Sequence, residues 1–102
     1  PFFFWAADKF KDTIRNLEKK PEILILRMRH VPTIDATGLS ALENVFSLSK
    51  QDGTQIILSG LQARPLAKIK RAGLLKYIDN SNIQPTIDHA IGRARQILKG
   101  NK

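Results

Sequence analysis

The chain has 102 residues, which fits one domain, and its hydrophobic and charged shares of 42% and 25% are those of an ordinary globular protein. It has no cysteine, which excludes disulfide bonds, thiolate catalysis and cysteine-ligated zinc, and no apolar run approaches the ~20 residues that span a bilayer. Of the net charge of +8, residues 61–102 carry +7, with nine basic and two acidic side chains. The basic character therefore belongs to the C-terminal part.

The first half of the chain alternates between strand and helix patterns. Residues 2–4 have strand composition, and residues 7–19 repeat their apolar side chains with the period of a helix. Residues 23–26 form an unbroken apolar run, which predicts a central strand covered on both faces, as in parallel sheets. A second helix then begins at Asp35 as its N-cap and ends at Gly53, which is free to adopt a positive φ.

The second half continues the same alternation. Residues 54–59 predict another buried strand, and Gly60 allows a tight exit from it. Residues 63–72 predict a short helix, residues 82–84 a short edge strand, and Thr86 the cap of a last helix. Strands and helices that alternate at this spacing predict an α/β domain with a largely parallel sheet.

The segment 34–40 lies between a predicted buried strand and the start of the next predicted helix, and it has two interpretations. In the first, Asp35 caps the helix, Thr37 fills its first turn and Gly38 makes room for packing. In the second, the helix start at the open end of a parallel sheet presents backbone N–H groups and a positive dipole to an anion or a partner. Residue types alone leave both interpretations open.

This segment carries a resemblance to a known family. The order of an apolar strand, residues 31–39 and an apolar helix resembles the signature of STAS domains, which include bacterial anti-sigma-factor antagonists and the C-terminal domains of SulP transporters. The opening residues 1–10 resemble the SulP branch specifically. So do residues 25–28 before the signature, and residues 58–61 and 71–74 after it. Together these motifs cover nearly the whole chain.

The resemblance implies a STAS-like fold, with a mixed, mostly parallel sheet flanked by about four helices. It implies one domain over residues 1–102 that lacks the first upstream strand of the full domain. It also implies a regulatory, protein-binding role without catalysis, cofactor or metal, at the cytoplasmic face of the inner (plasma) membrane. The implied partners are the transmembrane domain of a parent sulfate or anion transporter, a cytoplasmic protein, and anionic lipid or nucleotide. No specific nucleic acid is expected.

The resemblance also implies a working surface at the helix start and at the adjacent loop, which neighbouring strand ends should bring together. Its residues are Asp35, Ala36, Thr37, Gly38, Leu39, Ser59 and Gly60. In the antagonist branch, the residue after the signature aspartate is a serine that a partner kinase phosphorylates. That position is Ala36 here, which has no hydroxyl group, so this phosphorylation switch is not expected in this chain. Thr37 carries the nearest hydroxyl group that a kinase could phosphorylate.

A second candidate surface is basic. It consists of Arg64, Lys68, Lys70, Arg71 and Lys76. Such a run is either a solvated helix face or a contact for anionic lipid headgroups or an acidic partner. On the last helix, Arg93 is expected to be solvated or to face a partner.

Two other function classes remain open at this point. A free-standing signalling protein similar to anti-sigma-factor antagonists is disfavoured by Ala36 and by the SulP-like opening. A basic nucleic-acid binder fits the charge, but no recognition helix is visible. An enzyme is disfavoured, because His30 and His89 fall in different elements and no serine has a histidine and an acid at suggestive spacing.

Overall fold

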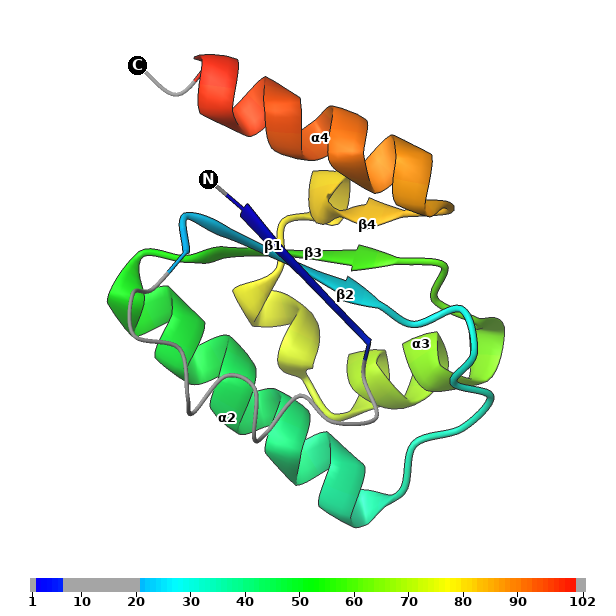
Figure 1. Ribbon diagram of the computed structural model, residues 1–102. Coiled ribbons are helices and arrows are strands. Elements are labelled where there is room, and N and C mark those ends of the chain that lie inside the picture. Colours follow the sequence, from blue (N-terminus) through cyan, green and yellow to red (C-terminus); the bar gives the residue numbers. More distant parts are fainter. Residues whose placement is uncertain (1, 7–20, 101–102) are drawn as a thin grey trace.

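The computed structural model of the protein describes residues 2–6 and 21–100, and Figure 1 shows how its elements are arranged. In chain order they are β1 (Phe2–Ala6), β2 (Ile23–Arg27), α2 (Ala36–Asp52), β3 (Gln55–Ser59), α3 (Ala63–Arg71), the 3-10 turns η2 (Leu74–Tyr77) and η3 (Asn80–Asn82), β4 (Ile83–Gln84) and α4 (Ile87–Gly100). The helix predicted over residues 7–19 lies outside the described residues. The described ranges hold three α-helices, against the four or so expected.

The strands form one four-stranded sheet in the order β1-β2-β3-β4. Each of the three pairings is parallel, so the predicted parallel sheet is confirmed. In the central pair, Ile25 of β2 lies opposite Ile57 of β3. The short strand predicted at residues 82–84 is β4, which pairs with the end of β3.

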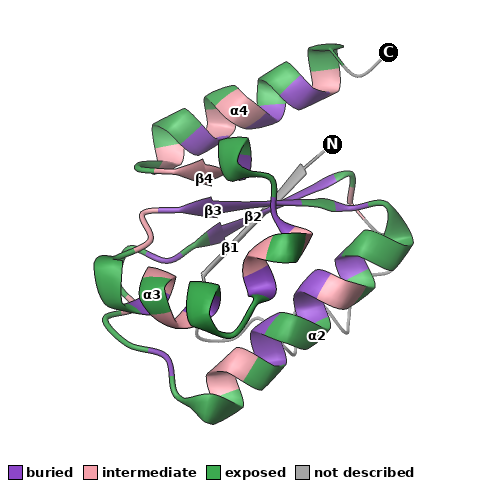
Figure 2. Ribbon diagram, turned by 180° about the vertical axis from the view of Figure 1, so that it is seen from behind, coloured by how far each residue is buried: buried purple, intermediate pink, exposed green. Residues whose placement is uncertain are grey.

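Helices cover both faces of the sheet, with α2 and α3 on one side and α4 on the other (Figure 1). Side chains of a strand point alternately to its two faces. Accordingly, Leu24 and Leu26 of β2 belong to the core under α2 and α3, while Ile23 and Ile25 belong to the core under α4. This explains the unbroken apolar run, and Figure 2 shows β2 and β3 buried between the helical layers.

Helix α4 lies close against the sheet because its inward residues are small. Ala90 and Ala94 have no exposed surface and pack with Ile23, Ile25 and Ile57. The predicted cap of this helix is confirmed, since the backbone N–H of residue 89 donates to Oγ1 of residue 86 at 3.1 Å. No helix in the described part of the chain has both the length and the apolar character needed to cross a membrane.

The prediction for Arg93 was wrong. Its side chain is half-buried, and its Nε donates a hydrogen bond to Oδ1 of Asn82 at 2.7 Å. Asn82 is itself only 3% exposed, and its Nδ2 donates to the carbonyl oxygen of Ile56 at 3.0 Å. Arg93 therefore ties α4 to the sheet edge, because a buried amide of this kind needs partners for all its polar atoms.

Candidate functional site

The start of α2 is built as the cap pattern predicts. Asp35 has extended backbone angles, and its Oδ1 accepts a hydrogen bond from the backbone N–H of Gly38 at 2.8 Å. Asp35, Ala36 and Thr37 are exposed. The first turn of α2 is therefore both capped and accessible to solvent.

Gly38 is required by close packing. A Cβ atom at this position would lie 2.9 Å from Cγ2 of Ile34 and 3.3 Å from Oδ1 of Asp35. Any larger residue would therefore push against the side chain before the helix and against the capping carboxylate. The packing interpretation of this glycine is correct.

Ser59 and Gly60 lie at the end of β3, beside the residues that follow β2. Ser59 is 3% exposed, and its carbonyl oxygen accepts from the N–H of Met28 at 2.8 Å. A Cβ on Gly60 would come within 2.9 Å of Cβ of Arg29. The loop after β3 also contacts Arg29 through Gln62, whose Nε2 donates to the carbonyl oxygen of Arg29 at 2.7 Å.

The basic surface divides into two parts, and the expectation for Lys68 needs a correction. Lys68 is half-buried, and its Nζ donates to the carbonyl oxygen of Ile34 at 2.8 Å, so it is not part of a solvated helix face. Its long stem reaches the loop that precedes α2 because α3 packs beside that loop. The other members are exposed; they are Arg64, Lys70, Arg71 and Lys76.

An open surface hollow of about 390 Å³ lies where the start of α2 meets the end of α3, and we call it the α2–α3 groove. Its lining residues are Ile34, Ala36, Leu39, Lys68, Arg71 and Ala72. The groove thus joins part of the predicted helix-start surface to part of the predicted basic surface, although the two were predicted separately. Ile34 and Ala72 were missed, since nothing in their local pattern indicates that two distant helix ends meet there.

The groove has two chemically different walls. One wall is apolar, and the other carries an ammonium and a guanidinium group. The six lining residues include no histidine, carboxylate, hydroxyl or thiol, and the amine of Lys68 donates to the carbonyl oxygen of Ile34. Among the residues that the structure describes, no group of three histidine, aspartate or glutamate side chains is placed to hold a metal ion.

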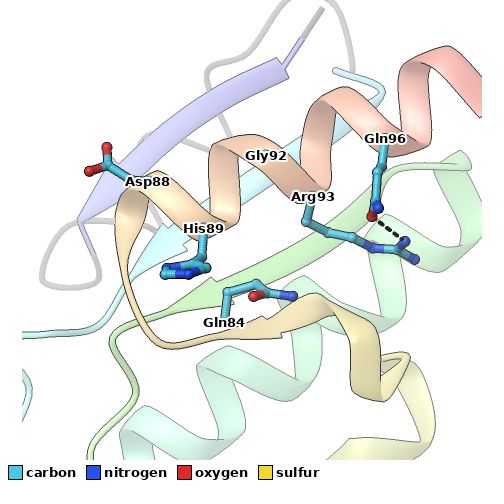
Figure 3. A pocket seen from close by; sticks show the side chains of 6 residues that line it. All are labelled: Gln84, Asp88, His89, Gly92, Arg93 and Gln96. Carbon is cyan, nitrogen blue, oxygen red and sulfur yellow. Dashed lines mark hydrogen bonds between the residues drawn. The ribbon is translucent and has the colours of Figure 1, made fainter.

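A second cavity, of about 490 Å³, lies beside α4 and β4 (Figure 3). Its lining residues are Gln84, Asp88, His89, Gly92, Arg93 and Gln96. Arg93 donates two hydrogen bonds, from Nε to Oδ1 of Asn82 and from Nη1 to Oε1 of Gln96 at 3.2 Å. Nδ1 of His89 lies 2.7 Å from the hydroxyl oxygen of Thr86. Asp88 points away from the other side chains in Figure 3. Most hydrogen bonds of these side chains go to residues outside the lining, and sequence reasoning did not identify this cavity.

Comparison with known proteins identifies the family of this chain. Residues 1–90 match the family model described as "STAS domain". The chain is 27% identical over 93 residues to the Bacillus subtilis (strain 168) protein named "Putative sulfate transporter YvdB". That match covers 90% of this chain but only 18% of the relative, so the chain spans less than a fifth of that protein.

Solved structures show the same similarity. A sulfate transporter family protein from Wolinella succinogenes superposes with a TM-score of 0.86 at 29% identity, covering 96% of this chain and 88% of that one. The STAS domain of a SulP transporter from Vibrio cholerae superposes with a TM-score of 0.83 at 26% identity, covering 97% and 84%. The murine solute carrier 26 family member A9 anion transporter, at 24% identity and a TM-score of 0.71, shares the fold. The chain therefore belongs to the STAS domain family, and the proteins it resembles include a SulP transporter STAS domain and a sulfate transporter family protein.

Proposed function

We propose that this chain is a cytoplasmic, regulatory and non-catalytic STAS domain of a SulP-family sulfate or anion transporter. The observation that carries the proposal is the similarity to the SulP transporter STAS domain of Vibrio cholerae, which extends over 97% of the chain. The relative from Bacillus subtilis bears the name of a sulfate transporter and is much longer than this chain, which suits a domain attached to a membrane part. The transmembrane domain of that parent protein is the first partner that we propose.

The α2–α3 groove is the proposed working surface. A partner bound there would shift the attached membrane domain between its states only if it made different contacts in each of them. The exposed helix start beside the groove supports this role, because Asp35, Ala36 and Thr37 are accessible to a partner. Ser59 is buried, so we assign it a part in shaping the neighbouring loop.

Thr37 is retained as a proposed phosphorylation site. It is exposed and occupies the second position of α2, where the helix dipole favours negative charge. Ala36 has no hydroxyl, so the switch used by the antagonist branch cannot operate at its usual position. Phosphate found on another residue after incubation with a cell extract of the source organism would remove Thr37 from the proposal.

The test is sulfate uptake by the full-length parent protein in proteoliposomes. Ala36→Trp fills the α2–α3 groove, and Asn44→Trp is the matched control, because Asn44 is exposed on the same helix but does not line the groove. Coupling between a regulatory site and a distant activity is typically worth five-fold or more, so we expect the groove variant to change uptake about five-fold and the control to leave it unchanged.

Three results would overturn the proposal. Uptake equal to that of the unmodified protein in both variants would show that the groove does not regulate transport. An equal loss in both would show a general disturbance of α2. A parent reading frame without any membrane-spanning region would remove the transporter itself.

A further inference from the structure

We infer that the α2–α3 groove binds an acidic, amphipathic polypeptide segment, with an apolar side chain against Ile34 and Leu39 and carboxylates against Arg71. The inference deepens the proposed function, because it gives the chemistry of the partner that docks in the same groove. It rests on three observations: the apolar wall, the row of cations beside it, and the shape of the groove.

The apolar wall comes from the entrance and first turns of α2. Ile34 is 6% exposed and belongs to the main core, and Leu39 is half-buried and packs against that core. Ala36 lies between them in the chain and is exposed, so its small side chain leaves the wall accessible. Such a wall contributes binding energy only to a partner that brings an apolar side chain of its own.

The opposite wall is cationic. Arg64, Lys68 and Arg71 follow the spacing i, i+4 and i+7, which places them on one face of α3 over about 10 Å. Lys68 is held by the carbonyl oxygen of Ile34 and so fixes the distance between the two walls. Arg71 is exposed and offers a planar guanidinium group, which suits a carboxylate that accepts two parallel hydrogen bonds.

One carboxylate, that of Asp35, lies between two groove residues in the chain, Ile34 and Ala36. Asp35 is the carboxylate of the α2 start, and its Oδ1 is engaged by the N–H of Gly38. The groove residues themselves include two cations and no anion. Charge complementarity therefore selects an acidic segment over a basic or a neutral one.

The shape favours a polypeptide over a lipid surface. Polybasic segments that bind anionic membranes usually present about four to eight cations to a plane of headgroups. Here two cations and four apolar residues line one hollow of about 390 Å³, so a partner that fits it must bring an apolar group beside its negative charge. A short segment with alternating acidic and apolar side chains meets both walls at once.

The probe is a fluorescein-labelled peptide of roughly twelve residues that alternates glutamate pairs with leucine, as suits a short groove-binding segment. Its binding to the 102-residue chain is followed by fluorescence anisotropy. A peptide with glutamine in place of glutamate is the control for charge. Vesicles of phosphatidylcholine with about one third phosphatidylserine form the lipid arm.

Arg71→Glu and Lys70→Glu are the matched variants, because both exposed cations lie on α3 but only Arg71 lines the groove. We expect the glutamate peptide to bind about ten-fold more weakly to the Arg71 variant and within about two-fold of normal to the Lys70 variant. Ala36→Trp should block the same peptide, while Asn44→Trp should not. Circular dichroism verifies that all four variants remain folded.

Several outcomes would overturn the inference. One is equal weakening by the two charge reversals, which would indicate a general effect of net charge. Another is equal binding of the glutamine peptide, which would remove the need for carboxylates. A third is binding to the anionic vesicles with no binding to the glutamate peptide. Because these measurements need no transport, they can fail while the uptake assay succeeds, or succeed while it fails.

Discussion

Gly60 meets two requirements at a single position. Its φ of +69° lies in the left-handed region, and a Cβ there would approach Cβ of Arg29 to 2.9 Å and its Cα to 3.2 Å. The first requirement concerns the backbone of the turn after β3. The second concerns the backbone of the loop after β2, which cannot move without disturbing the hydrogen bond between the N–H of Met28 and the carbonyl oxygen of Ser59.

We expect Gly60→Ala to lower the free energy of unfolding by about 2–3 kcal/mol, from left-handed strain and the clash together. Urea denaturation followed by circular dichroism measures the change. Gly92→Ala is the control, because Gly92 lies inside α4 and a Cβ there would meet nothing within 4 Å. That variant should gain about 0.5–1 kcal/mol from helix propensity. Equal effects of the two substitutions would contradict the strain argument.

Residues whose structure depends on near neighbours were predictable from the sequence. Asp35 and Gly53 act as the two ends of α2 as expected, because a cap interacts with the next turn only; Gly53 has a φ of 75°. Lys68 was not predictable in the same way. Its partner, the carbonyl oxygen of Ile34, lies 34 residues away, and helical spacing alone placed this lysine on the solvent side.

Among the elements, α4 is attached to the sheet by a polar contact as well as by its apolar face. Asn82 links β3 to α4. Its Nδ2 donates to the carbonyl oxygen of Ile56 in β3, and its Oδ1 accepts from Nε of Arg93 in α4. Helical period predicted that α4 has an apolar face, but it could not show which arginine turns back to the sheet edge. The packing of Ala90 and Ala94 against the sheet sets the rotation of α4, and this rotation decides which of its side chains lie beside η3.

A double-mutant cycle on Asn82 and Arg93 tests this attachment. We expect Asn82→Ala to lower the free energy of unfolding by about 2–3 kcal/mol, because the Ile56 carbonyl loses its side-chain donor in a buried place. The second substitution is Arg93→Ala. Together, Asn82→Ala and Arg93→Ala should lower the free energy of unfolding by about 1 kcal/mol less than the sum of their separate effects. Arg95→Ala, at an exposed position of the same helix, should stay within about 0.5 kcal/mol of the unmodified chain. Strict additivity in the cycle would show that the pair does not interact.

At the scale of the whole molecule, the parallel sheet and its two helical layers were predictable, because both buried strands show unbroken apolar runs. The α2–α3 groove was not. Its two walls come from helices whose lining residues lie about thirty positions apart, and only their packing against a shared core brings Leu39 near Arg71. Sequence patterns identified the two surfaces but gave no signal that they adjoin.

The net charge of +8 on a molecule with a radius of gyration of 12.6 Å predicts a salt dependence of stability. The Debye length is about 30 Å at 0.01 M salt and about 8 Å at 0.15 M, so every charge senses the others only at the lower concentration. Raising the salt across this range should raise the free energy of unfolding by an amount on the order of 1 kcal/mol, because repulsion within the compact state is screened.

The control for this salt effect is the double variant Lys70→Glu and Lys99→Glu, both at exposed positions. Each reversal replaces a positive charge with a negative one and lowers the net charge by two, so the net charge falls from +8 to +4. The salt dependence measured by urea denaturation should shrink accordingly. A chain whose stability is indifferent to salt, or falls with it, would show that local attractions outweigh the overall repulsion.

The strand order has a consequence for the time course of synthesis. Each of the first three strands pairs with a strand that is synthesised 21 to 32 residues later. The paired residues are Phe2 and Ile23, Ile23 and Gln55, and Leu58 and Ile83. No hairpin is available to start the sheet, and such non-local pairing slows folding. A nascent chain therefore carries β2 with one edge unpaired until β3 has left the ribosome, and with the apolar face of Ile23 and Ile25 uncovered until α4 has followed, which makes that interval the one in which chaperones would engage it.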